Sequence, residues 1–125
     1  MKKDNRPQTN ATVIDLFCGA GGLSYGFKKQ GYTISVGMDI DESCRFPFEA
    51  NIESTFVRTD LAKLQPDQLN EYFTPNKIKI LVGCAPCQPF STYNQKNDDP
   101  KWKLLKNFAR LIADCKPDVI SMENV

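Results

Sequence analysis

Short apolar runs alternate along the chain with amphipathic or polar segments of helical character. The apolar runs predict strands at residues 11–17, 32–40, 54–60, 77–83 and 117–125. The segments between them predict helices at residues 22–31, 41–52, 65–73 and 102–116. Asp41 is expected to cap the second helix, and Pro47 to break or shift it. Strands separated by helices form right-handed βαβ units, so the pattern predicts an α/β fold with a parallel, doubly wound sheet.

Composition narrows the class of protein without identifying a partner. With 41% hydrophobic and 25% charged residues, the 125 residues are typical of a globular domain that buries a core. Residues 1–10 predict a flexible tail ahead of one domain at 11–125, with no apolar segment that would mark a signal peptide or a membrane anchor. Five cysteines without an export signal favour reduced thiols in a cytoplasm. A net charge of +1 gives no sign of a nucleic-acid partner.

Chemically suggestive residues follow all five predicted strands. In open parallel sheets, ligands bind beyond the carboxyl ends of the strands, where the strand order reverses. Those ends carry the glycine-rich turn at 18–22, Asp39, Asp60, the pair Cys84 and Cys87, and Glu123. Because all five features fall on one edge of the sheet, the sequence predicts a site there.

The glycine-rich turn allows either a plain strand-to-helix connection or close approach of a ligand to the backbone. A nicotinamide dinucleotide would suit Asp39, about twenty residues onward, as a partner for ribose hydroxyls. However, Ser24 replaces the third glycine of that fingerprint, and Asp15 would repel a pyrophosphate. A positively charged nucleoside such as S-adenosylmethionine suits Asp15 better.

Two further side chains fit such a nucleoside. Phe17 is placed to cover an adenine ring, and Asp60 to accept a hydrogen bond from the adenine amino group. For Asp60 the alternative is a solvated carboxylate that caps the next segment.

The Cys-x-x-Cys spacing of Cys84 and Cys87 admits a redox pair, half of a zinc site, or one nucleophile. Zinc needs about four ligands, and the chain has no histidine and no second such pair. A redox pair is disfavoured because Pro89 and polar residues after Cys87 predict a loop in place of a helix. The favoured interpretation is a nucleophilic Cys87 beside Pro86, with Glu123 either a proton donor or a carboxylate satisfied by loop amides.

Four segments, in order, resemble the motifs of one family. They are "DLFCGAGGLSYGF", "GMDID", "GCAPCQPFS" and "MENV", and from about residue 11 the chain resembles the N-terminal part of the catalytic domain of DNA (cytosine-5) methyltransferases. The resemblance implies a Rossmann-like S-adenosylmethionine-dependent methyltransferase fold with strand order 3-2-1-4-5, truncated after the fifth strand. It implies that the cofactor is bound by Asp15, Phe17, Cys18, Gly19, Ala20, Gly21, Gly22, Asp39, Ile40, Asp60, Leu61 and Leu104.

The same resemblance implies a reaction on a cytosine flipped out of double-stranded DNA. Cys87, between Pro86 and Gln88, would attack carbon 6 of the ring while Glu123 holds and protonates the N3 edge, so that carbon 5 accepts the methyl group. Asn124 would fix Glu123 or its loop, and Ser91 would contact the substrate. No metal is implied, and Cys84 is expected to be a packed residue without a catalytic role.

The sequence also departs from the family pattern, because the target-recognition region and the C-terminal motifs are absent. We therefore expect a fragment or one subunit of a split enzyme, inactive alone, with strand 5 as an open edge and a complementary subunit as partner. The alternatives are a non-catalytic remnant that binds the cofactor or a partner, and a related methyltransferase acting on tRNA. The expected setting is a restriction–modification system in a bacterial or phage-like cytoplasm.

Overall fold

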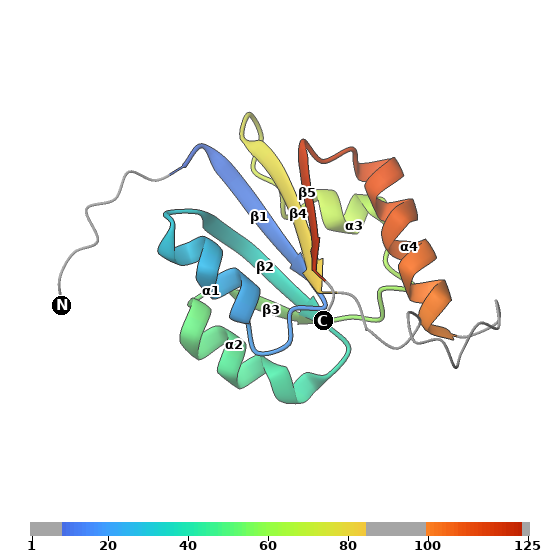
Figure 1. The fold of residues 1–125 in the computed structure, drawn as a ribbon, viewed down its shortest axis with the longest axis horizontal. Helices are drawn as coiled ribbons and strands as arrows, with labels where there is room; N and C mark the ends of the chain where they lie inside the picture. The colour runs from blue at the N-terminus through green and yellow to red at the C-terminus, as the bar shows by residue number, and fades with distance from the viewer. Residues whose placement is uncertain (1–8, 85–99, 124–125) are drawn as a thin grey trace, which may run out of the picture.

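Five parallel strands form a single sheet in the order β3-β2-β1-β4-β5 (Figure 1). The structure is a computed structural model that describes residues 9–84 and 100–123. The strands are β1 Ala11–Leu16, β2 Thr33–Asp39, β3 Thr55–Arg58, β4 Ile78–Cys84 and β5 Val119–Glu123. Strand β1 pairs with β2 on one side and with β4 on the other. The predicted parallel sheet and its strand order are thus confirmed, and the order reverses between β1 and β4.

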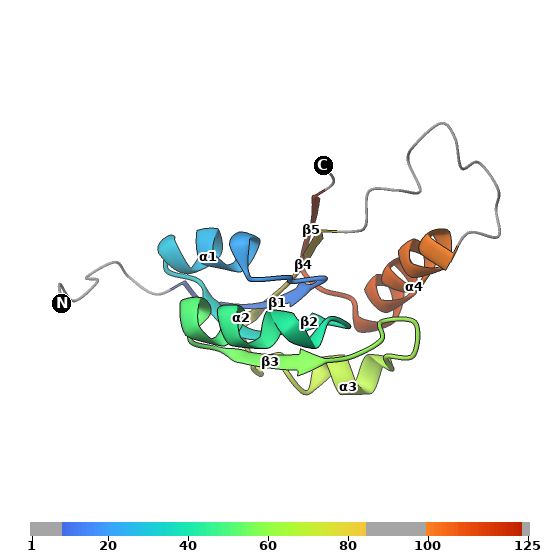
Figure 2. The same cartoon turned by 90° about the horizontal axis from the view of Figure 1, so that it is seen from below.

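Helices cover both faces of this sheet (Figure 2). They are α1 Gly22–Lys29, the 3₁₀ turn η1 Glu42–Cys44, α2 Arg45–Ile52, α3 Pro66–Asn70 and α4 Pro100–Cys115. Helices α1 and α2 pack with Ala11 and Val13 of β1, whereas α3 and α4 pack with Ile14 and Leu16 of the same strand. All six residues of β1 are buried, as expected for a central strand covered on both faces.

The predicted second helix begins later than expected. Asp41 accepts a hydrogen bond from the Ser43 N–H at 3.0 Å, so it caps the 3₁₀ turn. The prediction that Asp41 caps the α-helix is therefore wrong. Helix α2 starts at Arg45 and places Pro47 in its first turn, where a missing N–H removes no helical hydrogen bond. Pro47 is thus accommodated by the shifted start, and the helix runs on to Ile52.

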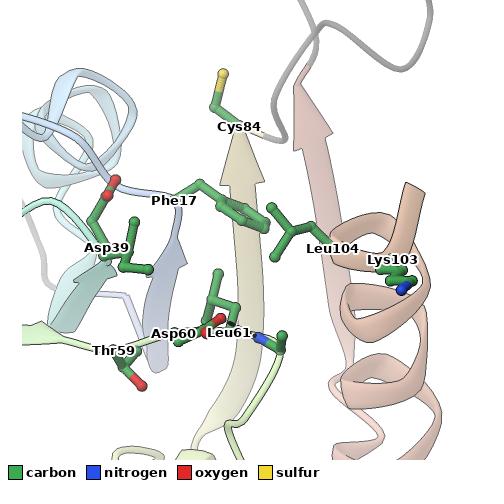
Figure 3. A pocket seen from close by; sticks show the side chains of 10 residues that line it. Phe17, Asp39, Thr59, Asp60, Leu61, Cys84, Lys103 and Leu104 are labelled. Carbon is green, nitrogen blue, oxygen red and sulfur yellow. Dashed lines mark hydrogen bonds between the residues drawn. The ribbon is translucent and has the colours of Figure 1, made fainter. Parts of the chain in front are cut away.

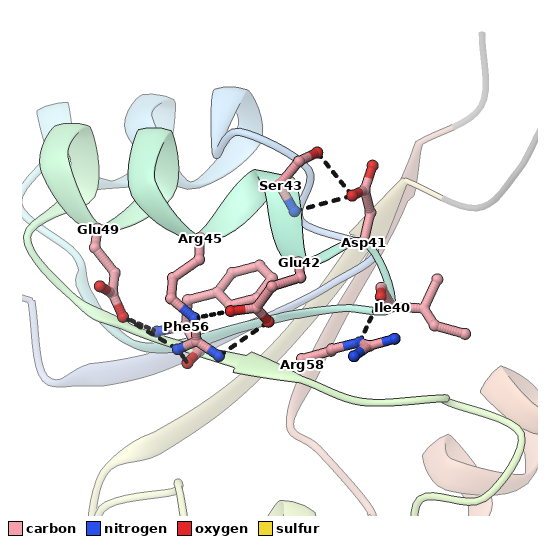
Figure 4. Close-up of polar contacts among 8 residues, drawn as sticks. All are labelled: Ile40, Asp41, Glu42, Ser43, Arg45, Glu49, Phe56 and Arg58. Atoms are coloured by element: carbon pink, nitrogen blue, oxygen red, sulfur yellow. Dashed lines mark hydrogen bonds and ion pairs between the residues drawn. The ribbon is translucent and has the colours of Figure 1, made fainter.

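A polar cluster around Arg45 joins the start of α2 to β3 (Figure 4). The Arg45 guanidinium donates to the Phe56 carbonyl oxygen at 2.9 Å and forms ion pairs with Glu42 and Glu49. It also lies 5.0 Å from the centre of the Phe56 ring. The Glu49 carboxylate also accepts from the Phe56 N–H at 3.4 Å, so Arg45 and Glu49 together link α2 to that edge strand.

The structure describes the start of the predicted domain and the edge strand near residue 123. Thr9 donates its N–H to the Gly31 carbonyl, and the Asn10 carbonyl accepts from the Ile78 N–H. Residues 1–8 lie outside the described residues, so the flexible tail stays a prediction. At the other end of the sheet, β5 forms the edge, and Val119, Ile120 and Met122 remain 47%, 44% and 50% exposed.

Candidate cofactor site

A cavity of about 500 Å³ opens at the carboxyl ends of the strands, where the strand order reverses (Figure 3). Its walls come from four strand ends and from the first turns of α4. The lining residues are Phe17, Asp39, Ile40, Thr59, Asp60, Leu61, Ala62, Cys84, Lys103 and Leu104. The position is the one at which ligands bind in open parallel sheets.

Phe17 forms an aromatic wall of the cavity. It directly follows β1 and has a φ of 54°, a left-handed conformation that a bulky residue adopts only when its surroundings enforce it. Figure 3 shows its ring directed toward Leu104 of α4. The ring centre also lies 6.4 Å from that of Phe108, so packing against α4 helps hold the ring in place.

The glycine-rich turn is fastened to the end of β2 by Asp39. One carboxylate oxygen of Asp39 accepts the Gly19 N–H at 3.0 Å, and the other accepts the Asp41 N–H at 3.0 Å. The Cys18 N–H donates to the Met38 carbonyl at 3.1 Å. Each carboxylate oxygen can accept a further hydrogen bond, so Asp39 can hold the turn and still receive a ligand hydroxyl.

Gly21 explains why the turn needs glycine. It has a φ of 97°, and a Cβ atom there would lie 2.7 Å from Ile52 Cγ1. The turn therefore packs directly onto α2, and a side chain at this position would push the two apart. Ala20, Gly21 and Gly22 line a second, shallower depression with Tyr25 and Asn51, outside the main cavity.

Asp60 and its neighbours form the floor of the cavity after β3. One oxygen of the Asp60 carboxylate accepts the Ala62 N–H at 3.0 Å, so this residue does cap the following turn. It also lines the cavity, so the two sequence interpretations of Asp60 are compatible. Leu61 is buried and packs into the α3–α4 core, which fixes the turn against the sheet.

The proposed catalytic edge is only partly described. Cys84 at the end of β4 lies opposite Glu123 at the end of β5 in the strand register. Cys84 is half-buried and lines the cavity, so it lies at the site and not simply in the core. Pro86, Cys87, Gln88, Ser91 and Asn124 lie outside the described residues, and their roles stay predictions.

Two predicted cofactor residues lie beneath the glycine-rich turn, not in the cavity wall. Asp15 is 1% exposed and accepts a 2.5 Å hydrogen bond from the Ser24 hydroxyl, while burial raises its pKa to about 6. Cys18 is also buried, and burial, with the nearby Asp15 and Asp39, raises the pKa of its thiol above the usual range. Cys18 is therefore a packed thiol and not a nucleophile.

Sequence reasoning missed Thr59, Ala62 and Lys103, and it placed Cys84 at this edge of the sheet without a role in the site. Thr59, Ala62 and Lys103 adjoin predicted residues, so the strand-end rule applied to whole turns would have found them. Among residues 9–84 and 100–123, no cluster of three or more potential ligands for a metal ion occurs. No helix in the part of the chain that the structure describes is long and apolar enough to cross a membrane.

Comparison with solved structures defines the class of fold. The chain superposes with a TM-score of 0.77 and 31% identity on a DNA modification methyltransferase candidate encoded within a prophage (E. coli), covering 92% of this chain and 32% of that one. The Dnmt2 methyltransferase of S. pombe shares the fold at a TM-score of 0.72 and 20% identity, over 91% of this chain and 36% of that chain. The fold is the Rossmann-like fold of S-adenosylmethionine-dependent methyltransferases.

Residues 11–125 match the family model of the C-5 cytosine-specific DNA methylases. The type II methylase M.HgiDII of Herpetosiphon aurantiacus is 46% identical over 114 residues, which are 90% of this chain and 32% of that protein. The type II methyltransferase M1.HphI of Haemophilus parahaemolyticus is 34% identical, over 91% of this chain and 32% of its own length. The chain belongs to the C-5 cytosine-specific DNA methylase family, and it spans about a third of the length of these relatives.

Proposed function

We propose that these residues form the cofactor-binding part, and one side of the catalytic centre, of a DNA cytosine-5 methyltransferase that uses S-adenosylmethionine. The observation that carries the proposal is the cavity, which combines an aromatic wall with two carboxylates, Asp39 and Asp60, beside the ends of β4 and β5. An apolar cavity with few convergent polar groups is typical of small-molecule sites.

The described residues fit this cofactor chemically. Phe17 and Leu104 offer apolar surfaces for a purine, Asp39 offers acceptors for ribose hydroxyls, and Asp60 offers one for an amino group. When bound, the cofactor supplies an electrophilic methyl group. The protein's part is to hold the nucleoside against Phe17 with the carboxylates already fixed by backbone N–H groups, which lowers the ordering cost of binding.

On the substrate side, we propose that Cys87 attacks carbon 6 of a flipped cytosine and that Glu123 protonates N3. The register of β4 and β5 supports the pairing of these motifs, because Cys84 and Glu123 end neighbouring strands. Attack at carbon 6 makes carbon 5 electron-rich enough to accept the methyl group. Loss of the carbon 5 proton then expels the Cys87 sulfur and restores the ring.

We further propose that DNA methylation needs protein beyond these residues, supplied by the same polypeptide or by a complementary subunit. Val119, Ile120 and Met122 support this, because an exposed apolar edge strand is a surface that proteins normally cover. The names of the relatives favour a restriction–modification setting, and we propose a bacterial or phage-like cytoplasm. Robust sequence-specific methyl transfer by residues 1–125 alone, on DNA or on tRNA, would contradict the need for more protein.

Cofactor binding has a direct test in isothermal titration calorimetry with S-adenosylmethionine. Phe17→Ala removes the aromatic wall, and loss of one base–aromatic stack should weaken binding by roughly 5- to 150-fold. Phe46→Ala is the matched control, because Phe46 is 81% exposed and outside the cavity. Equal affinity of both variants and the unaltered chain would contradict the proposed site.

A further inference from the structure

Lys103 brings a positive charge to the wall of the cavity at the strand ends. It lies near the start of α4 and precedes Leu104, whose side chain is directed toward Phe17 (Figure 3). The two carboxylates that line the same cavity, Asp39 and Asp60, come from the ends of β2 and β3. Among the lining residues that the structure describes, Lys103 is the only cation. The cavity therefore combines strong acceptors on the sheet side with one strong donor on the helix side.

Helix stability does not explain a lysine at this position. The N-terminal end of a helix carries partial positive charge, which disfavours a cation in the first turn. The first turn of α4 contains no acidic residue that would offset this effect. Within the part of the chain that the structure describes, the exposed side chain of Lys103 forms no hydrogen bond or ion pair. Its ammonium group is thus free to meet a ligand in the cavity.

An adenine ring needs both kinds of hydrogen-bonding partner. Its amino group donates, and the ring nitrogens N1 and N7 on either side of that group accept. An ionised carboxylate such as that of Asp60 can serve the amino group but not a ring nitrogen, because it only accepts. Asp60 is held in place by the Ala62 N–H at 3.0 Å. A ring nitrogen next to the amino group needs a separate donor, and a lysine ammonium group supplies three N–H bonds.

Resting on the proposed function, we propose that Lys103 is a specificity-determining residue for the adenine base of the cofactor. Its ammonium group donates to a ring nitrogen beside the amino group, N1 or N7, while the Asp60 carboxylate accepts from the amino group itself. The flexible four-carbon stem of lysine lets the charged group reach into the cavity from α4. Lys103 contacts the base and takes no part in methyl transfer.

The experiment is titration calorimetry of the 125-residue chain with adenosine at pH 7. Adenosine is uncharged, so its affinity does not report repulsion between Lys103 and the charged groups of S-adenosylmethionine. Lys103→Met keeps an unbranched apolar stem and removes the donor, and it should weaken adenosine binding by roughly 2- to 12-fold. Lys106→Met is the matched control, because Lys106 is exposed on the same helix and does not line the cavity. It should leave the affinity unchanged.

Two analogues locate the hydrogen bond. In 1-deazaadenosine and 7-deazaadenosine, a C–H group replaces one ring nitrogen. The analogue that lacks the contacted nitrogen should bind the unaltered chain more weakly than adenosine, and Lys103→Met should weaken it no further. With the other analogue, Lys103→Met should cost as much as it does with adenosine. A purely structural role of Lys103 would not produce such a difference between analogues.

Urea unfolding separates an effect on binding from an effect on the helix. Because Lys103 opposes the helix dipole, Lys103→Met should leave the urea midpoint unchanged or raise it slightly. A lower midpoint together with equal losses of affinity for all three nucleosides would mean that Lys103 supports α4, and it would overturn the inference.

Distinct outcomes separate the inference from the proposed function. If adenosine and S-adenosylmethionine bind the unaltered chain, but Lys103→Met weakens all three nucleosides equally or none of them, the role of Lys103 is overturned and the cofactor site stands. If neither ligand binds the unaltered chain, the proposed function of these residues fails, and the inference fails with it. A loss confined to the nucleosides that keep the contacted nitrogen supports the inference.

Discussion

Gly37 in β2 provides a test of how closely α2 packs against the sheet. A Cβ atom on Gly37 would lie 2.3 Å from Cζ and 2.4 Å from Cε2 of Phe48, and 2.9 Å from the Cys18 sulfur. The Phe48 ring is fully buried, and its centre lies 6.0 Å from that of Phe56. On its other side, a Cβ atom on Gly21 would lie 3.0 Å from Cδ2 of the Phe48 ring, so the ring has little room to move away from Gly37.

We therefore expect Gly37→Ala to destabilise the fold. Overpacking of this kind costs about 1–3 kcal/mol, and the smaller entropy of the unfolded alanine chain offsets only about 0.4–1 kcal/mol of it. Gly37 does not have a positive φ, so the effect reports packing and not backbone strain. A net loss of about 1 kcal/mol corresponds to a fall in Tm of roughly 4 °C for a domain of this size.

The assay is urea unfolding followed by circular dichroism, with Gly26→Ala as the matched control. Gly26 lies in α1 with no atom within 4 Å of the added Cβ, so alanine there should stabilise the helix by about 0.5–1 kcal/mol. Combining Gly37→Ala with Phe48→Leu should recover at least about 0.5 kcal/mol relative to the sum of the two single variants. A neutral Gly37→Ala, or strict additivity with Phe48→Leu, would refute this account of the packing.

Three further predictions concern a buried charge, a surface cluster and the catalytic edge. The pKa of Asp15 is raised by burial from 3.8 to about 6, so its contribution to stability is complete below pH 3.8 and is lost as the pH rises through 6. The difference in unfolding free energy between the unaltered chain and Asp15→Asn should therefore fall by about 2 kcal/mol from pH 4 to pH 7, and a constant difference would contradict this. Arg45→Ala should lower the urea midpoint of unfolding, chiefly through loss of its bond to a strand carbonyl, whereas Arg58→Ala, which loses one exposed bond, should lower it less. In the full-length protein, Cys87→Ala should end covalent trapping by DNA containing 5-fluorocytosine, while Cys84→Ala should largely preserve it; equal losses would return the cysteine pair to consideration as a redox or metal site.

Much of the fold was predictable because the central strands are buried on both faces. Such strands appear in the sequence as continuous apolar runs, and the run at 11–17 contains β1 with its six buried residues. The third helix was less predictable. It ends at Asn70 and not at residue 73, because Tyr72 and Phe73 instead donate to the carbonyls of Leu69 and Asn70 in tighter turns that carry Phe73 into the α3–α4 core.

The site was predictable to the level of strand ends but not of side-chain direction. Phe17, Asp39, Asp60 and Leu104 line one cavity, as their places after strands and at the start of the last helix suggested. Asp15 lies buried beneath the turn, and its predicted contact with the cofactor stays a prediction. A strand buried on both faces shows no polar side in its sequence, so alternation could not indicate which face Asp15 occupies.

The reversal of strand order has a consequence for how the chain folds as it is synthesised. Strands β1 to β3, together with Asp39 at the end of β2 and Asp60 after β3, are complete by residue 60, before β4 is made. Until β4 arrives, β1 is an edge strand, although in the complete sheet all six of its residues are buried, and Ala11 pairs with Ile78 only later. An open apolar edge invites pairing with other chains, so this interval is the aggregation-prone stage of biosynthesis. Docking of β4 ends that exposure in the same step that brings the Cys84 side of the cavity into place.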